Sequence, residues 1–110
     1  VRTRIHEAGN DVGELAWPMP LLPAFEKEMT DSKIADTRNL GAGRWGGANT
    51  AAAFLKQFVP NRSDDEDAEQ ITWAHMDIAG TYWGAKTNKM VGYGATGIHV
   101  RTMVRLITGE

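Results

Sequence analysis

The chain has 110 residues, with 12 lysines and arginines against 14 aspartates and glutamates, a formal net charge of −2 and no cysteine. This length allows one domain with a modest core, because a domain of this size buries roughly 65% of its unfolded surface. The charge balance excludes an overall basic surface for nucleic acid or anionic membranes, and the lack of cysteine excludes disulfide scaffolds and thiolate metal sites. No apolar run approaches the roughly 20 residues of a membrane span, so we expect a soluble protein.

The first third of the chain predicts two short helices joined by an extended connector. The first helix should end at Gly9 and Asn10, which favour the left-handed conformation. Its apolar stripe is Val1, Ile5 and Ala8. The connector LAWPMPLLP (15–23) contains three prolines, which exclude a helix interior or a central strand. The second helix is predicted from residues that recur at helical spacing, namely Leu22, Phe25 and Met29.

The middle of the chain predicts a strand, a helix and a charged loop. SKIADTRNL (32–40) is short and polar, and we interpret it as a partly exposed strand. A helix from about Asn49 to Phe58 is indicated by an alanine-rich start and by a proline after Val59. NRSDDEDAEQ (61–70) carries five acidic residues and no bulky apolar one, so it predicts a solvated loop.

The last third predicts an apolar strand, a long loop and a closing helix. The strand is ITWAHMDIA (71–79), and the glycine-bearing loop 80–97 has the length and composition of loops that often carry function. The closing helix should end at Gly109. Its apolar stripe is Val100, Met103, Val104 and Ile107. Because helices alternate with strands, we expect an α/β fold, a layered mixed sheet flanked by helices.

Residues Gly41 to Gly46 match the pattern G-x-G-x-x-G between a possible strand and a predicted helix. In that context the backbone N–H groups of such a loop hold a pyrophosphate, which would make the chain a dinucleotide-binding module. Three features argue against it: the preceding strand is polar, Trp45 places bulk inside the turn, and the acidic residues about 20 positions later lie in a solvated loop. The alternative is a turn that needs glycine for its own backbone or packing.

His75 and Asp77 are two residues apart in the predicted strand 71–79, so their side chains should point to one face. Two side chains supply only half of the ligands that a divalent ion needs, and the other histidines, His6 and His99, are distant in sequence. The alternative is structural, with His75 bonded to a carbonyl or carboxylate and Asp77 accepting backbone N–H groups near the strand end.

Aromatic and basic residues occur together in the long loop, a combination found where proteins stack on nucleic acid bases. These residues are Tyr82, Trp83, Lys86 and Lys89. Stacking on nucleic acid also requires a positive groove, which the acidic balance of the chain argues against, so we expect no nucleic-acid partner.

Three quoted stretches together resemble one enzyme family. They are ADTRNLGAGRWGGANTAAAFLKQFV, WAHMDIAGT and GATGIHVRTMVRLI, and the similarity extends upstream to AWPMPL. In this order they resemble the C-terminal part of the leucyl (cytosol) aminopeptidase family, metal-dependent enzymes that remove N-terminal residues from peptides. The resemblance covers nearly the whole chain apart from the acidic insert 61–70.

The resemblance implies that residues 1–110 are the C-terminal portion of a metalloaminopeptidase catalytic domain, and hence an incomplete part of its layered fold. Family members hold two divalent ions, zinc or manganese, with lysine, aspartate and glutamate residues that precede the segments seen here. The signature N-T-D-A-E-G-R-L does not occur in this sequence. We therefore expect no catalytic residue and no metal ligand in this chain, and we expect the isolated chain to be inactive.

The substrate pocket is the part of the site that the resemblance places on this chain. In the family, residues just after the DIA strand line the apolar pocket for the N-terminal side chain of the peptide, and the matching positions are Ala79 and Tyr82. Tyr82 departs from the smaller or flexible apolar residues usual there, so neither the pocket size nor a preference for leucine follows. Ligands of open α/β sheets bind at the carboxyl ends of strands, which supports this placement.

The family also implies a cytoplasmic protein that acts on peptide substrates and assembles as a hexamer at full length. In the complete enzyme the two ions would activate a water and stabilise the oxyanion. For this chain the upstream part of the catalytic domain would be a further partner. Two other functions remain as alternatives: a non-enzymatic interaction or assembly unit with exposed apolar faces, and the dinucleotide-binding module described above.

Overall fold

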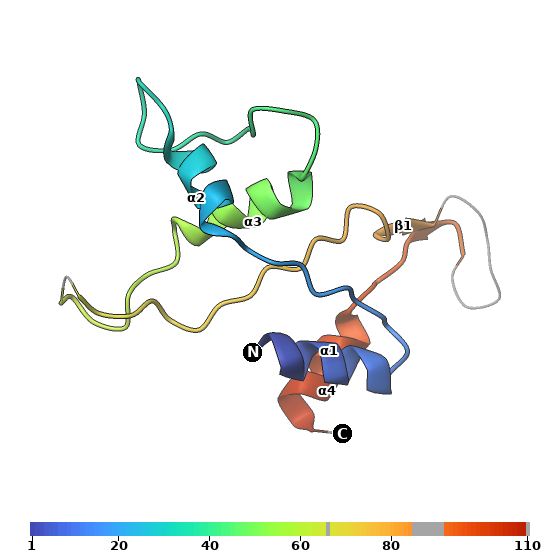
Figure 1. Cartoon of the computed structure of the whole chain (residues 1–110). Helices are drawn as coiled ribbons and strands as arrows, with labels where there is room; N and C mark the ends of the chain where they lie inside the picture. The colour runs from blue at the N-terminus through green and yellow to red at the C-terminus, as the bar shows by residue number, and fades with distance from the viewer. Residues whose placement is uncertain (66, 85–91, 110) are drawn as a thin grey trace. The chain divides into compact units, whose positions relative to one another are not determined.

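The computed structural model describes residues 1–65, 67–84 and 92–109 and contains helices and a small sheet in that part of the chain (Figure 1). The elements are, in order, α1 (Arg2–Asp11), α2 (Pro23–Thr30), α3 (Gly47–Lys56), β1 (Trp83–Gly84), β2 (Gly94–Ala95) and α4 (Val100–Thr108). They form two units. The first unit comprises Val1–Pro18 and Met76–Glu110, and the second comprises Met19–His75.

In the first unit, α1 packs against α4 (Figure 1). The predicted end of the first helix at Gly9 and Asn10 is wrong, because α1 continues to Asp11 and the chain turns at Gly13, which has a φ of 71°. Gly9 serves a different purpose. A Cβ at this position would lie 2.6 Å from the carbonyl oxygen of Glu14, whose N–H donates to the Gly9 carbonyl at 2.8 Å.

Glu14 joins the two helices through the N-terminal end of α4. Its Oε2 accepts hydrogen bonds from the backbone N–H of Thr102 at 2.9 Å and from the Thr102 hydroxyl at 2.8 Å, and its Oε1 accepts one from Arg101 Nε at 3.2 Å. Glu14 is only 5% exposed and Thr102 is fully buried. Burial alone would raise the pKa of Glu14, but the hydrogen bonds from Thr102 and the charge and hydrogen bond of Arg101 outweigh it and lower the pKa below its ordinary 4.5.

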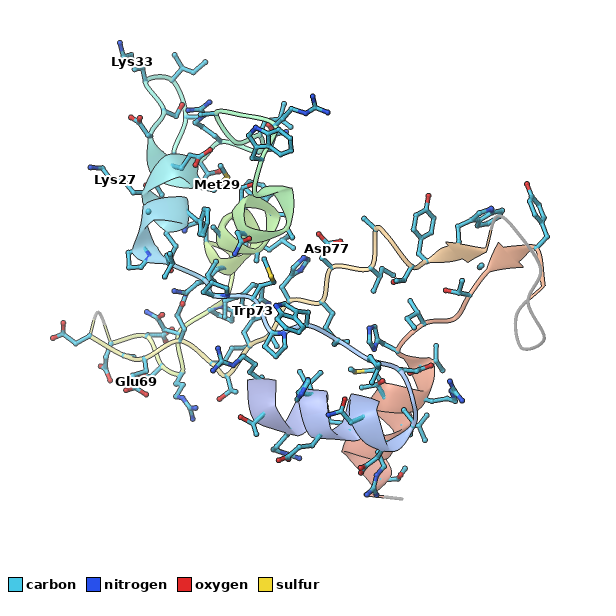
Figure 2. The ribbon with its side chains drawn as sticks, turned by 45° about the vertical axis from the view of Figure 1, so that its right-hand side comes forward. Lys27, Met29, Lys33, Glu69, Trp73 and Asp77 are labelled. Carbon is cyan, nitrogen blue, oxygen red and sulfur yellow. The ribbon has the colours of Figure 1, made fainter. Side chains whose placement is uncertain are left out.

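In the second unit, α2 packs against α3. Met29 is 1% exposed and lies on the side of α2 that faces α3, where Ala53 is completely buried (Figure 2). Lys56 Nζ and Glu26 Oε1, 2.7 Å apart, add an ion pair at the edge of the contact. Both helices were predicted, although α3 begins and ends two residues earlier than the range from Asn49 to Phe58.

The closing helix α4 follows its prediction closely. It begins at Val100 and ends after Thr108, where Gly109 adopts the left-handed conformation expected of a stop residue, with a φ of 76°. The residue before α4 is His99, the one non-glycine residue of the described part with a positive φ, at 65°.

The two predicted strands do not form. Residues 32–40 contain bends and no strand, and residues 71–79 lie in neither a strand nor a helix. A strand exists only where a neighbouring strand pairs with its backbone, and in the described part the one sheet is β1 with β2, inside the predicted loop 80–97. Over the residues that the structure describes, four helices and two short strands make a small mixed structure, and the layered sheet is not confirmed.

The acidic segment 61–70 runs out and back between two paired residues. Asn61 and Gln70 form an isolated antiparallel bridge, and Arg62 N–H donates to the Glu69 carbonyl at 2.9 Å. All described residues of the segment are exposed except Ala68, which is half-buried. Among the described residues, no helix is both long and apolar enough to cross a membrane.

Candidate functional site

The two residues expected to line a substrate pocket, Ala79 and Tyr82, lie in one tight turn. The carbonyl of Ile78 accepts the N–H groups of Thr81 and Tyr82, each at 2.9 Å. The Asp77 carboxylate accepts the N–H of Ala79 at 2.9 Å. The turn is therefore closed by local bonds from both its backbone and a side chain, which holds Ala79 and Tyr82 in a fixed relation.

The small sheet follows directly after this turn and is hydrogen-bonded to it. Antiparallel pairing sets Trp83 opposite Ala95 and Gly84 opposite Gly94. Thr96 extends the connection, because its N–H donates to the Tyr82 carbonyl at 2.9 Å and its hydroxyl donates to the Thr81 carbonyl at 2.7 Å. The turn is therefore hydrogen-bonded to the residue that follows β2 and is not an isolated loop tip.

The sheet also gathers three aromatic rings. The Tyr82 and Trp83 ring centroids are 6.5 Å apart, and Trp83 meets Tyr93 edge to face at 5.7 Å. Sequence reasoning missed Tyr93, because only the pairing of β1 with β2 brings it beside Trp83. Lys86 and Lys89, the basic half of the aromatic and basic pattern, lie outside the described residues.

The chemistry of this turn and its rings suits binding rather than bond cleavage. Tyr82 is 53% exposed, Trp83 is 49% exposed and the Ala79 methyl group is exposed, so apolar faces are open to a ligand. Asp77, which precedes the turn, uses its Oδ1 to accept the N–H of Ala79. The site can therefore contact an apolar side chain through aromatic faces.

His75 and Asp77, the pair weighed above as a metal site, belong to different units. Asp77, labelled in Figure 2, accepts a backbone N–H as the structural interpretation predicted. His75 instead stacks on Trp73, with ring centroids 6.3 Å apart and 21° between the ring planes. No hydrogen bond from His75 to a carbonyl or carboxylate occurs among the described residues, so that part of the interpretation is wrong for them.

The other two histidines are tied into the first unit. His6 Nδ1 donates to the Ala16 carbonyl at 3.2 Å, and its Nε2 accepts from Asn10 at 3.3 Å. His99 Nδ1 lies 3.2 Å from the Thr102 hydroxyl. Because that hydroxyl gives its only hydrogen to the Glu14 carboxylate, His99 Nδ1 must be the donor of this bond. Both rings therefore carry structural hydrogen bonds.

The two divalent ions implied by the family resemblance do not fit the described residues. Within 1–65, 67–84 and 92–109, no group of three or more histidine, aspartate or glutamate side chains is placed to hold a metal ion. A divalent site needs three or four such ligands. No chemical step can therefore be assigned to a metal on these residues.

The glycine-rich loop Gly41 to Gly46 is already bonded to a negatively charged group, the carboxylate of Glu28 in α2. The N–H of Ala42 donates to Glu28 Oε1 at 2.5 Å, and a Cβ at Gly41 would lie 2.9 Å from the same oxygen. A pyrophosphate would need this N–H and would be repelled by the carboxylate. Gly46, with a φ of 74°, accepts the first hydrogen bonds of α3. The loop geometry therefore fits a packing turn and argues against a dinucleotide site.

Comparison with known proteins shows that nearly the whole chain matches one family. Residues 1–104 match the model of the cytosol aminopeptidase family, catalytic domain. A probable cytosol aminopeptidase of Solibacter usitatus is 44% identical over 106 residues, which cover 96% of this chain and 20% of that protein. Similar proteins occur in Micrococcus luteus (45% identical over 109 residues, 94% of this chain and 20% of that protein) and in Methylobacterium radiotolerans (43% over 105 residues, 96% and 19%). The chain thus spans about one fifth of the length of these relatives.

Proposed function

Because this chain belongs to the cytosol aminopeptidase family, we propose that it is part of a catalytic domain that hydrolyses N-terminal residues from peptides. The observation that carries the proposal is the match of residues 1–104 to the catalytic domain of that family. Relatives more than 40% identical, each named a probable cytosol aminopeptidase, support it.

The contribution of this chain is scaffold and part of the substrate pocket. Ala79 and Tyr82 contact the apolar side chain of the substrate's N-terminal residue. The support is the geometry of their turn, which is closed by Asp77 and Ile78 and braced by Thr96. A fixed turn presents an apolar wall at low entropic cost, which is what a substrate pocket requires.

The two divalent ions, zinc or manganese, are held by residues other than the described ones of this chain. The support is the lack of any described cluster of three ligands. When bound, such ions supply the activated water of hydrolysis. We further propose that the 110-residue chain alone hydrolyses no peptide. The complete protein acts in the cytoplasm on peptide substrates, in line with the names of its relatives. Its assembly as a hexamer is proposed from the family resemblance alone.

A chimera tests this function directly. The stretch of the Solibacter usitatus relative that matches this chain is replaced by residues 1–104, and the purified chimera is assayed with leucyl-p-nitroanilide in added manganese. We expect hydrolysis by the chimera and none by the 110-residue chain. An inactive but folded chimera would contradict the proposed function, and so would activity of the isolated chain after contaminants are excluded.

Substitution of Tyr82 in the same chimera tests the pocket. Tyr82→Ala should raise kcat/KM for a phenylalanyl substrate relative to a leucyl substrate by roughly tenfold, because removal of the ring enlarges an apolar pocket. Tyr82→Phe keeps the ring and serves as the matched control, with an unchanged ratio. An equal effect of both substitutions, or of neither, would show that the ring does not border the pocket.

A further inference from the structure

The turn that contains Ala79 and Tyr82, which we call the pocket turn, is bonded to Thr96. The backbone N–H of Thr96 donates to the Tyr82 carbonyl at 2.9 Å, and its hydroxyl donates to the Thr81 carbonyl at 2.7 Å. The same hydroxyl accepts the N–H of Ile98 at 3.3 Å. A hydroxyl has one hydrogen, and because the Ile98 N–H is itself a donor, that hydrogen is committed to the Thr81 carbonyl. The direction of this hydrogen bond is therefore fixed.

These bonds hold the backbone on both sides of the Tyr82 Cα atom. The peptide group before this atom is held at its N–H by the Ile78 carbonyl and at its C=O, which belongs to Thr81, by the Thr96 hydroxyl. The peptide group after it is held at its C=O by the Thr96 N–H. Because each peptide group is planar, two held planes determine φ and ψ of Tyr82, and these angles set the direction of its Cα–Cβ bond and its allowed rotamers. Tyr82 is 53% exposed, so its direction depends on this backbone more than on packing against neighbours.

Of these three bonds, only the one to the Thr81 carbonyl depends on the side chain at position 96. The N–H of Thr96 continues the pairing of β1 with β2, in which Trp83 lies opposite Ala95, and any residue except proline would supply it. Thr81 is exposed, so water can take the place of a missing hydroxyl at its carbonyl. Loss of the Thr96 hydroxyl should therefore loosen the peptide group before Tyr82 without unfolding the pocket turn.

We propose that Thr96 is a positioning residue for substrate selection. Its hydroxyl holds the Thr81 carbonyl, and this bond directs the Tyr82 ring as a wall of the pocket for the N-terminal side chain of the substrate. The inference rests on the proposed function, in which Tyr82 borders that pocket. Thr96 touches no substrate itself and acts through Tyr82.

A wall whose direction is held discriminates between substrate side chains of different size. An aromatic side chain is larger than that of leucine, and it enters the pocket only if the Tyr82 ring swings away. Such a swing changes φ and ψ of Tyr82 and therefore strains the bond between the Thr96 hydroxyl and the Thr81 carbonyl. The hydroxyl thus penalises the larger substrate and leaves the smaller one unaffected, which is how a repulsive element produces specificity.

The substrate preference of the chimera described above tests this inference. Thr96→Val keeps the shape of the side chain and removes the hydroxyl. We expect the ratio of kcat/KM for a phenylalanyl substrate to that for a leucyl substrate to rise about threefold, which is less than for Tyr82→Ala because the ring remains. The change should lie in KM, with kcat for each substrate nearly unchanged, because pocket contacts stabilise the ground state and the transition state alike. Thr96→Ser keeps the hydroxyl and should retain the original ratio.

A double substitution separates positioning from a general loss of stability. If Thr96 acts through the Tyr82 ring, adding Thr96→Val to the Tyr82→Ala chimera should not change the ratio further. Thr30→Val is the matched control and should leave the ratio unchanged, because its hydroxyl also donates to a backbone carbonyl, that of Glu26 at 3.2 Å, but in the second unit. Equal ratios for Thr96→Val and Thr96→Ser would overturn the proposal. So would an effect of Thr96→Val that persists without the ring.

Amide hydrogen exchange of the 110-residue chain decides the matter if the chimera does not fold. The Tyr82 amide shares its peptide group with the Thr81 carbonyl, so it should exchange about threefold faster in Thr96→Val and at an unchanged rate in Thr96→Ser and Thr30→Val. An unchanged rate in Thr96→Val would overturn the proposal. A folded chimera without activity would contradict the proposed function and this inference with it, whereas an active chimera whose ratio ignores Thr96→Val would contradict this inference alone.

Discussion

The two helix pairs of this chain are held together in opposite ways. In the pair α1 and α4, a buried carboxylate, Glu14, binds the first turn of a helix 88 residues away. In the pair α2 and α3, Met29 and Ala53 fill the contact, and the one charged pair, between Lys56 and Glu26, lies at its edge. The first contact is directional and charged, whereas the second depends on shape and apolar area.

This difference predicts how each helix pair should respond to substitutions and to pH. A buried charge is stable only while its donors remain in place, and its contribution depends on pH. An apolar contact tolerates substitutions of similar volume and ignores pH, but it is weakened when a cavity is made. Amide hydrogen exchange can follow α3 and α4 separately, so each prediction below has a readout in its own unit.

The largest effect should come from a cavity between α2 and α3. Met29→Ala removes most of a side chain that is 1% exposed, and we expect the free energy of opening of α3 to fall by about 2–5 kcal/mol. Met29→Leu keeps the volume and should cost less than about 1.5 kcal/mol. Exchange rates at α3 amides measure both. An equal loss at α4 would show that the two units do not unfold separately.

The next effect concerns the carboxylate between α1 and α4. Glu14→Gln keeps the size of the side chain but removes its charge and replaces one acceptor oxygen by an NH2 donor, which then faces either Arg101 or the Thr102 N–H. The opening free energy of α4 should therefore fall by about 1.5–3 kcal/mol. Glu7→Gln, at an exposed position of α1, is the control and should change little. If the two variants are alike, the Glu14 carboxylate does not hold the pair together.

A change of pH should separate the two pairs without any substitution. The pKa of Glu14 is lower in the folded chain than its ordinary 4.5, so its contribution is fully present above pH 4.5 and is lost as pH falls from there through the folded pKa. The groups that face it are Arg101 and Thr102, with His99 bonded to the Thr102 hydroxyl. Amides of α4 should therefore lose protection in acid, and this loss should be reduced in Glu14→Gln. A response of α4 that is the same in both proteins would contradict this assignment.

The features that the sequence predicted are those set by neighbours along the chain. An alanine-rich start and a proline after Val59 predicted α3, and Gly109 was predicted to end α4, which it does. The predicted strands at 32–40 and 71–79 were wrong because the composition of a segment does not identify the partner that must pair with it. The contact of Glu14 with Thr102 was missed because no local pattern connects residues 88 positions apart.

In the candidate site, too, the sequence predicted some residues and missed those that only folding brings together. Family motifs named Ala79 and Tyr82, and the structure places them in one turn, whereas their role as pocket residues stays a prediction. Tyr93 was missed because antiparallel pairing, and not spacing in the sequence, brings it beside Trp83. The apolar stripe of α4 was predicted from its spacing, but nothing in that spacing indicated that it would remain uncovered.

The smallest effect should come from the ion pair between α2 and α3, and it sharpens the comparison with Glu14. Lys56 and Glu26 keep 33% and 30% of their side-chain surface exposed, so water and salt compete with their attraction. Lys56→Met retains the apolar stem and should change the opening free energy of α3 by no more than about 1 kcal/mol, and by less in high salt. Lys27→Met, at an exposed position of α2, is the matched control (Figure 2). A loss as large as that of Glu14→Gln would mean that both helix pairs depend on charge, and the contrast between the two contacts would fail.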